Sequence, residues 1–238
     1  MLHDQHCHTK YSLDSKASLE EYYKICSKYN CKYFVTTEHI DFNSVCNNQD
    51  WTVDYQALKN ELNDLHKKYP NCIPLLGVEL GYRNEYISKM QDVIDLNSFD
   101  VVNLSIHDNG IYDYYEQKGF IKEGIPKMLK TYFNNILDAL DNFSDFDVLS
   151  HFDFGFKTAY LLDNAVTINT YEKEVRTIFK ILIEKDKTLE INMKVENMID
   201  HKHLNTILDW YYEEGGRNIT LSSDSHNEEA YEGYYQTR

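Results

Sequence analysis

The chain alternates short apolar runs with longer segments whose apolar residues recur every three or four positions. The short runs are rich in Val, Ile, Leu and Thr and do not alternate strictly with polar residues, which is typical of parallel strands buried on both faces. They predict seven strands, at about residues 2–8, 33–39, 73–80, 101–107, 146–151, 188–193 and 218–222.

The segments between these runs carry helical periodicity. Leu58, Leu62 and Leu65 fall on one face of such a helix. The Ser-Leu-Glu-Glu sequence at residues 18–21 has the form of a capping box, which predicts a helix start. The Gly-Gly pair at residues 215–216 predicts the end of a late helix. The chain therefore reads as repeated strand–helix units.

Histidines and carboxylates gather where the predicted strands end. Imidazole nitrogens and carboxylate oxygens are ligands for zinc, iron and manganese. Because they come from many strands but from one end, they predict a multinuclear site and not a structural zinc knot. The candidate ligands are His6, His8, His39, Glu79, His107, His151, Asp224 and His226.

Three of these positions carry a more specific signal. His6 and His8 are two residues apart on one predicted strand, so both rings project from the same face. Glu79 ends an apolar run, where a carboxylate is costly unless it is paired or metal-bound. A carboxylate can join two cations, so Glu79 is the candidate bridging ligand; a salt bridge inside the fold is the alternative. Asp14 lies in the polar loop after His8 and either ligates a third metal or caps a turn.

This distribution of candidate ligands also bears on the fold. Repeated strand–helix units build either an open doubly wound sheet or a closed barrel. Only closure brings so many strand ends around one point, and the active sites of such barrels lie at the carboxyl ends of the strands. The twelve residues after His226 are too few for an eighth unit. We therefore predict an α/β protein with a distorted seven-stranded, TIM-like (β/α)7 barrel, as a single domain over residues 1–238.

Charge and cysteine content limit the partners. The net charge of −15 argues against a nucleic acid, whose phosphates need Lys and Arg. A small phosphorylated substrate remains compatible if metal ions supply positive charge locally. The five cysteines form no CxxC pair and predict no disulfide framework. With no apolar stretch of membrane-spanning length and no signal-peptide pattern, we expect a cytoplasmic protein without a membrane partner. The sequence does not determine the oligomeric state.

At this point the motifs match a known family. The chain resembles the polymerase-and-histidinol-phosphatase (PHP) superfamily of metal-dependent phosphoesterases and, within it, the histidinol-phosphate phosphatases. The first-strand and last-strand motifs are those of the superfamily, and Thr-Glu-His-Ile-Asp-Phe and Val-Glu-Leu-Gly-Tyr point to that branch. The matching segments are residues 4–9, 11–14, 37–42, 77–82, 99–100, 105–107, 150–153, 190–192 and 223–226.

The resemblance implies a trinuclear site of zinc, iron or manganese ions in a distorted barrel. It also implies that Asp14 completes the ligand set, so that nine positions would hold two or three divalent ions. Phosphatases of this branch tend to carry arginines where this chain has Lys157 and Lys194. Lysine pairs with phosphate as a point charge but lacks the bidentate fork of arginine. Arg83, on the same rim as Glu79, is a further candidate for substrate binding or an exposed loop cation.

These residues lead to a functional hypothesis. A hydroxide that bridges two metals attacks the phosphorus of L-histidinol phosphate in line and releases L-histidinol and phosphate in histidine biosynthesis. Glu79 and Asp224 are the catalytic candidates, the second as a ligand or as the acid that protonates the leaving group. The alternatives are a related phosphoesterase acting on nucleotides or other phosphate esters, or a non-catalytic metal-binding barrel.

Other acidic and aromatic residues receive weaker roles. Asp4 and Asp153 are candidates to orient ligand imidazoles, or else they are buried caps of strand ends. The ammonium and imidazole of histidinol call for acidic or aromatic partners. Glu38, Asp41, Phe42 and the loop at residues 112–115 are the candidates for those contacts.

Overall fold

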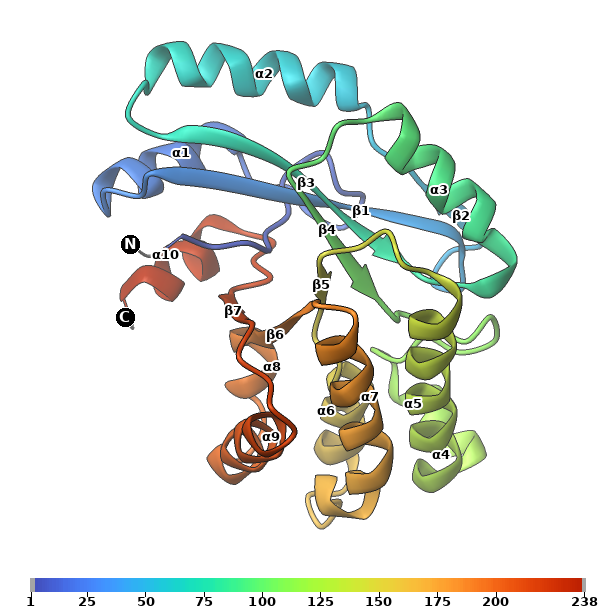
Figure 1. Cartoon of the computed structure of the whole chain (residues 1–238). Coiled ribbons are helices and arrows are strands. Elements are labelled where there is room, and N and C mark those ends of the chain that lie inside the picture. The colour runs from blue at the N-terminus through green and yellow to red at the C-terminus, as the bar shows by residue number, and fades with distance from the viewer. Residues whose placement is uncertain (1–2, 237–238) are drawn as a thin grey trace.

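A seven-stranded sheet forms the centre of the protein, which is described here by a computed structural model over residues 3–236 (Figure 1). The strand order is β2-β1-β3-β4-β5-β6-β7. All neighbouring strands are parallel except β1 and β2, which are antiparallel. The strands are β1 (Tyr33–Ser44), β2 (Gln49–Trp51), β3 (Ile73–Gly81), β4 (Val101–Ser105), β5 (Val148–Leu149), β6 (Thr188–Asn192) and β7 (Ile219–Ser222).

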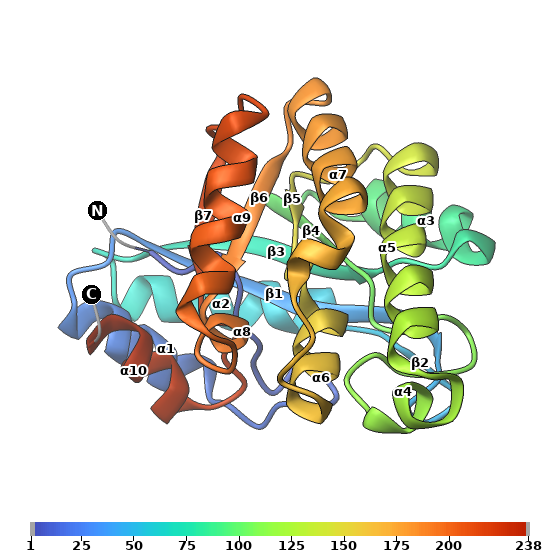
Figure 2. The same cartoon turned by 90° about the horizontal axis from the view of Figure 1, so that it is seen from below.

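Helices cover this sheet, and their apolar faces form the core with it. In Figures 1 and 2, α2 and α3 lie beside β1 and β3, while α5, α7 and α9 lie beside the later strands. The helices are α1 (Leu19–Lys28), α2 (Tyr55–Lys68), α3 (Ile87–Leu96), α4 (Gln117–Glu123), α5 (Ile125–Asn142), α6 (Phe154–Leu162), α7 (Glu172–Glu184), α8 (Met193–Glu196), α9 (His201–Glu213) and α10 (Glu228–Gln236). Short 3-10 turns η1 (Asn84–Tyr86) and η2 (Ile168–Tyr171) precede α3 and α7.

The predicted helix signals are confirmed, with one difference. Leu58, Leu62 and Leu65 are the buried leucines of α2. The hydroxyl of Ser18 caps α1 by accepting from the backbone N–H of Glu21. The other half of the predicted capping box is absent, because the backbone N–H of Ser18 donates to the Glu228 carboxylate at 2.7 Å. This bond joins α1 to α10.

The predicted closed barrel is not what the structure shows: the sheet is open and mixed. The predicted strand at residues 2–8 reduces to an isolated bridge between Cys7 and Ser225, and residue 2 lies outside the described residues. Cys7 accepts from Thr37 of β1, and His8 donates to Ser225 beyond the end of β7. Residues 6–8 therefore lie between the first and last parallel strands, but too few of them pair with either strand to form a ladder.

The edge strand β2 was not predicted. Strand β1 continues five residues beyond His39 and pairs there with β2, as between Asp41 and Trp51. His39 thus lies inside a strand and not at its end. The β2 residues are Gln-Asp-Trp, which carry no apolar run, so only pairing with the long β1 places them in the sheet.

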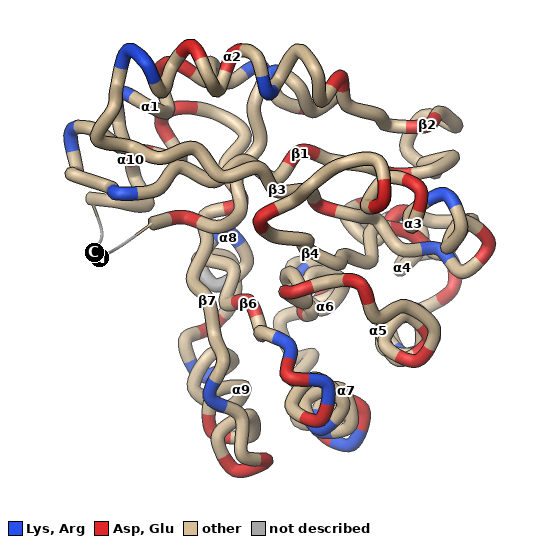
Figure 3. Tube along the Cα trace, turned by 45° about the horizontal axis from the view of Figure 1, so that its top comes forward, with Lys and Arg blue, Asp and Glu red and all other residues tan. Residues whose placement is uncertain are grey.

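Outside the cluster of buried acids, the charged residues lie mostly on the surface of this architecture. Figure 3 shows acidic residues on many helices, interspersed with Lys and Arg on α2 and α7. Most of the acidic residues therefore lie on solvated helix faces that also carry basic residues. Within the described part of the chain, the helices are too short or too polar to span a membrane.

Candidate metal centre

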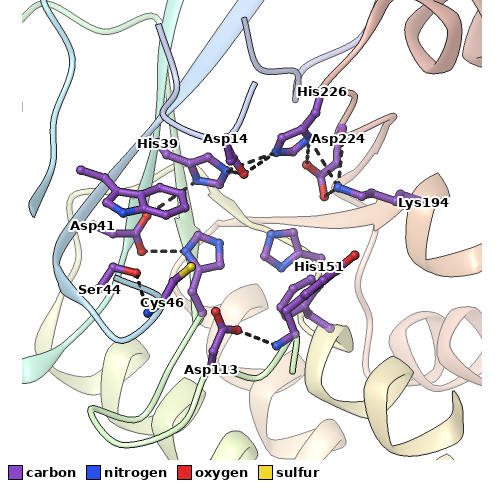
Figure 4. A pocket seen from close by; sticks show the side chains of 14 residues that line it. Asp14, His39, Asp41, Ser44, Cys46, Asp113, His151, Lys194, Asp224 and His226 are labelled. Atoms are coloured by element: carbon purple, nitrogen blue, oxygen red, sulfur yellow. Dashed lines mark hydrogen bonds and ion pairs between the residues drawn. The ribbon is translucent and has the colours of Figure 1, made fainter. Parts of the chain in front are cut away.

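The fold brings together the side chains of all nine predicted ligands. His39 in β1 is paired in register with Glu79 in the parallel strand β3, so the two side chains lie next to each other. His107 follows β4 and His151 follows β5, both in the loops at the carboxyl ends of their strands. The segment at residues 6–8 and the residues after β7 supply further side chains to the same cluster. Figure 4 labels Asp14, His39, His151, Asp224 and His226 around one cavity.

Glu79 occupies the centre of this cluster and is fully buried. Five histidines from four segments of the chain face its carboxylate. The ring nitrogens closest to it belong to His151 (2.8 Å), His39 (2.9 Å), His107 (3.1 Å), His6 (3.2 Å) and His8 (3.3 Å). Imidazole nitrogens and carboxylate oxygens are the donor types that zinc, iron and manganese bind, so this arrangement fits a metal centre.

A second group of ligand atoms lies on the solvent side of Glu79. Nε2 of His8 is 3.4 Å from Oδ1 of Asp224. Oδ2 of Asp14 is 3.1 Å from Nε2 of His226 and 3.5 Å from Nε2 of His39. Asp14 therefore faces this group of side chains, as the family resemblance implied, and not a turn.

The charge distribution is that of a site built for cations. Burial alone raises the pKa of Glu79, but the neighbouring imidazolium charges, led by His6 and His39, hold it well below its usual value. Burial lowers the pKa of His39, yet Glu79 and Asp14 raise it to about 10. These carboxylates thus attract protons onto the imidazoles that face them, and a divalent ion competes with those protons for the same lone pairs.

Buried atoms without hydrogen bonds support the fit of metal ions. Oε2 of Glu79 and Nδ1 of His39 are buried and lie 2.9 Å apart, yet they make no well-aligned hydrogen bond, and Nδ1 of His151 is buried without a hydrogen-bond partner among the described residues. Such atoms are costly in a folded protein unless another partner satisfies them. Four sets of three ligand atoms lie within 4.8 Å of one another: His8, His39 and His226; His6, Glu79 and His151; His6, His8 and Asp224; His39, Glu79 and His107.

Polar residues behind the cluster fix two of the rings. Nδ1 of His107 is 2.8 Å from the Asp41 carboxylate. Nδ1 of His8 is 3.2 Å from the hydroxyl of Ser12, whose own proton goes to Glu38. A ring that donates through Nδ1 keeps the lone pair of Nε2 for a metal.

Glu190 fixes a further ring and was not predicted as part of the site. Its Oε1 lies 2.7 Å from Nδ1 of His6. The sequence gave Glu190 no role beyond the matching motif at residues 190–192. A carboxylate inside the apolar strand β6 is the same signal that identified Glu79, so it was available in the sequence.

The structure corrects the roles of three other acids. Asp153 accepts from Nε2 of His203 at 2.7 Å and contacts no candidate ligand ring. Asp4 accepts from the backbone N–H groups of His6 and Ser223 and so joins the first segment to the end of β7. Glu38 is fully buried, and its two carboxylate oxygens accept hydrogen bonds from the hydroxyls of Thr9 and Ser12, so they are not free to bind a substrate.

Two of the candidate ligands have unusual backbone conformations. His151 has φ +22° and Asp224 has φ +50°, in the left-handed region that favours glycine. Neither is glycine, so each conformation costs free energy that the surrounding contacts must offset. This strain lies where side chains are aimed at the cluster.

The cluster opens into a cavity of about 400 Å³ (Figure 4). Aromatic and acidic side chains form much of its wall. The lining residues are Asp14, His39, Asp41, Ser44, Cys46, Trp51, His107, Asp113, Tyr115, His151, Phe154, Lys194, Asp224 and His226. Phe42 does not line it, and of the predicted loop at residues 112–115 only Asp113 and Tyr115 do.

The three predicted substrate-binding cations differ in position. Lys194 lines the cavity, and its Nζ is 3.5 Å from Oδ2 of Asp224. Lys157 is buried behind the cavity wall. Arg83 forms ion pairs with Glu85 and Asp108 and does not line the cavity.

Comparison with known proteins decides the family. The family model of the PHP domain matches residues 4–194. This chain is a PHP domain protein. The match confirms the resemblance seen in the motifs. A probable histidinol-phosphatase of Clostridium acetobutylicum is 31% identical over 227 residues, which cover 95% of this chain and 87% of that protein. A histidinol-phosphatase of Lactococcus lactis is 25% identical over 94% of this chain and 83% of that protein.

Solved structures show the same PHP fold. The crystal structure of histidinol phosphate phosphatase from Lactococcus lactis, complexed with zinc, L-histidinol and phosphate, superposes with a TM-score of 0.86 at 23% identity and covers 98% of this chain and 90% of that one. A putative histidinol phosphatase from Listeria monocytogenes gives a TM-score of 0.81 at 15% identity and covers 98% of both chains.

Proposed function

We propose that this PHP protein is a metal-dependent phosphomonoesterase that hydrolyses L-histidinol phosphate to L-histidinol and phosphate. The observation that carries the proposal is the convergence of five imidazoles, from four parts of the chain, on the buried carboxylate of Glu79. The choice of substrate is supported by the relatives named histidinol-phosphatase and by the Lactococcus lactis structure with zinc, L-histidinol and phosphate.

The nine clustered side chains would hold two or three divalent ions of zinc, iron or manganese, with Glu79 as the bridging ligand. When bound, such ions lower the pKa of a water molecule toward neutrality and offset the charge of phosphate oxygens. The ligands are His6, His8, Asp14, His39, Glu79, His107, His151, Asp224 and His226.

The chain itself supplies cations for the phosphate group. Lys194 stands on the cavity wall, and although burial lowers its pKa, Asp224 and Glu79 raise it overall, so it remains an ammonium ion at neutral pH. It would bind phosphate oxygens as a point charge. Lys157 would be the second cation. Arg83 is committed to Glu85 and Asp108, so the proposal leaves substrate binding to the two lysines.

Asp224 would act as a ligand and not as the acid that protonates the leaving group. Burial raises its pKa, but Lys194 and the imidazole of His8 hold it well below the usual value. A carboxylate that is ionised at every pH of activity has no proton to donate. The leaving group therefore takes its proton from a group other than Asp224.

The remaining cavity wall suits an aromatic cation. Trp51, Tyr115 and Phe154 offer ring faces, and Asp41 and Asp113 offer carboxylates, all around the same cavity. L-Histidinol carries an ammonium group and an imidazole, which bind favourably to acids and to ring faces. A nucleoside monophosphate has no ammonium group to occupy the acidic part of this wall.

A substrate panel tests the proposal. The zinc-loaded, manganese-loaded and metal-free proteins are assayed with histidinol phosphate, nucleoside monophosphates and phosphotyrosine, and bound metal is quantified in each sample. We expect metal-dependent turnover with the highest kcat/KM for histidinol phosphate. A higher kcat/KM for nucleotides would replace the substrate, and metal binding without hydrolysis of any ester would favour a non-catalytic barrel.

A further inference from the structure

Glu190 is a buried carboxylate that the proposed chemistry leaves without a role. It lies in β6, between β5 and β7 (Figure 1), and is 2% exposed. Four donors from four segments surround it. They are Nδ1 of His6, the backbone N–H of His151, the hydroxyl of Ser222 and the side-chain amide of Asn192.

The two oxygens of Glu190 divide these donors. Oε1 faces His6 at 2.7 Å and Ser222, while Oε2 faces the backbone N–H of His151 at 2.6 Å and Asn192 at 3.2 Å. An ionised carboxylate only accepts hydrogen bonds. Nδ1 of His6 must therefore carry a proton. Nε2, which faces Glu79 at 3.2 Å, is then the nitrogen that can bind a metal once the metal displaces its proton.

The bond to His151 restrains the backbone and not the ring. His151 has the strained value of φ +22°, and its carbonyl accepts from the hydroxyl of Tyr132 at 3.1 Å. The backbone of His151 is thus held at both its N–H and its carbonyl group. This turn aims Nε2 of His151 at Glu79, 2.8 Å away.

His6 and His151 form one set of candidate ligands together with Glu79. We propose that Glu190 is a positioning residue for this set: its carboxylate sets the tautomer of His6 and holds the backbone turn of His151. The inference rests on the proposed metal-binding function and assigns a role to a residue that touches neither metal nor substrate.

The Glu190→Gln substitution replaces one of the two acceptor oxygens with an NH₂ donor. If the amide NH₂ took the place of Oε2, it would face the N–H donors of His151 and Asn192. The NH₂ group therefore takes the place of Oε1, where Nδ1 of His6 and the hydroxyl of Ser222 can accept. Nδ1 of His6 then has no proton, Nε2 is protonated, and the ring can no longer coordinate a metal through Nε2.

The test measures zinc binding directly. Metal-free wild type and Glu190→Gln are titrated with zinc in competition with a chromophoric chelator, and bound zinc is counted by elemental analysis after desalting. We expect Glu190→Gln to bind the weakest-held zinc about 10–100-fold less tightly, as is typical when a partner behind a ligand is removed. Histidine-selective NMR of the zinc-loaded proteins should show the His6 proton on Nδ1 in wild type and on Nε2 in the variant.

Asp153→Asn is the matched control. Asp153 is equally buried, at 3% exposed, and lies two residues from His151, but its carboxylate pairs with His203. We expect this variant to bind zinc as wild type does. A folded Glu190→Gln protein with wild-type zinc affinity would refute the proposal, and so would an equal loss of zinc in Asp153→Asn.

Glu190→Asp decides the question if Glu190→Gln fails to fold, as judged by circular dichroism. The shorter side chain keeps the charge but withdraws it from His6 and from the His151 peptide, so weaker zinc binding is expected and unchanged binding would contradict the proposal. Zinc binding does not depend on the substrate, so a wild-type protein that binds zinc but hydrolyses no ester would refute the proposed function alone.

Discussion

Nζ of Lys157 lies 4.0 Å from the centre of the Phe154 ring, which forms part of the cavity wall. The ring of Tyr115 lies 4.8 Å from the same atom. Lys157 is 2% exposed, and its Nζ has no hydrogen-bond partner among residues 3–236. An ammonium group contacted by ring faces keeps all three of its donors unused. Lys157 is therefore suited to an anion that binds beside these rings.

The charge of Lys157 should govern how substrate affinity depends on pH. Burial, assisted by the charge of Lys194, lowers the pKa of Lys157 to about 8, so the side chain becomes neutral above that pH. If it binds phosphate, KM should rise by about fivefold from pH 8 to pH 9, because the charged fraction of Lys157 falls by that factor. In Lys157→Arg, whose guanidinium stays charged, this rise should disappear. Steady-state kinetics across pH 7–9 measure both; the same rise in Lys157→Arg would exclude Lys157 as its source.

Loss of the Glu79 charge should greatly weaken the binding of zinc at the site. In Glu79→Gln the amide can no longer balance the imidazoles and ions around it, and its NH₂ group points at ligand lone pairs. We expect lower bound zinc by elemental analysis and a kcat/KM reduced by at least about 100-fold, the upper end of what substitutions behind a metal ligand cost. Glu61→Gln, which changes a partly exposed acid paired with Lys10, is the control and should keep both. Unchanged zinc content in Glu79→Gln would rule out its role as a ligand.

Metal affinity should increase with pH. Although burial lowers them, the pKa values of His6 and His107 are raised well above the usual value by neighbouring carboxylates, as is that of His39. In the metal-free protein these rings hold protons at neutral pH, and zinc must displace them. Zinc affinity should therefore rise between pH 6 and pH 8. Calorimetry in buffers of different ionisation enthalpy should detect proton release, and binding without it would contradict the proton competition.

Asp4 should make stability fall as pH rises. Burial raises its pKa from 3.8 to about 6, against the hydrogen bonds from Ser223, so the folded protein binds the proton more tightly than the unfolded chain. Its contribution to stability is complete below pH 4 and is lost as pH rises through 6. The free energy of unfolding of wild type, relative to Asp4→Asn, should fall by about 2 kcal/mol between pH 4 and pH 6.

Urea unfolding at pH 4 and pH 6 measures this difference, because the histidines titrate in both proteins and cancel. Asp209→Asn, at an exposed position on α9, should show no such pH-dependent difference from wild type. A difference between wild type and Asp4→Asn that stays constant with pH would show that the Asp4 carboxyl does not titrate in this range.

Helices α1, α2, α5, α7 and α9 and the six later strands were predictable because they depend on local patterns of burial. Leu58, Leu62 and Leu65 repeat at helical spacing, and their burial follows from that spacing alone. The strand at residues 2–8 could not be judged in this way. Its side chains are largely polar, and its backbone bonds go to Thr37 and to the residues around Ser225. Likewise β2 exists only because β1 extends far enough to pair with it.

The sequence by itself determined which side chains have the chemistry to bind metal ions, because imidazoles and carboxylates at strand ends are visible without a structure. The tertiary structure decided what stands behind and beside them. Glu190 meets His6 across 184 residues of sequence, and Asp153 meets His203 across 50. Such contacts follow from how distant strands and helices pack, and no local pattern of residues encodes which buried acid will face which ring.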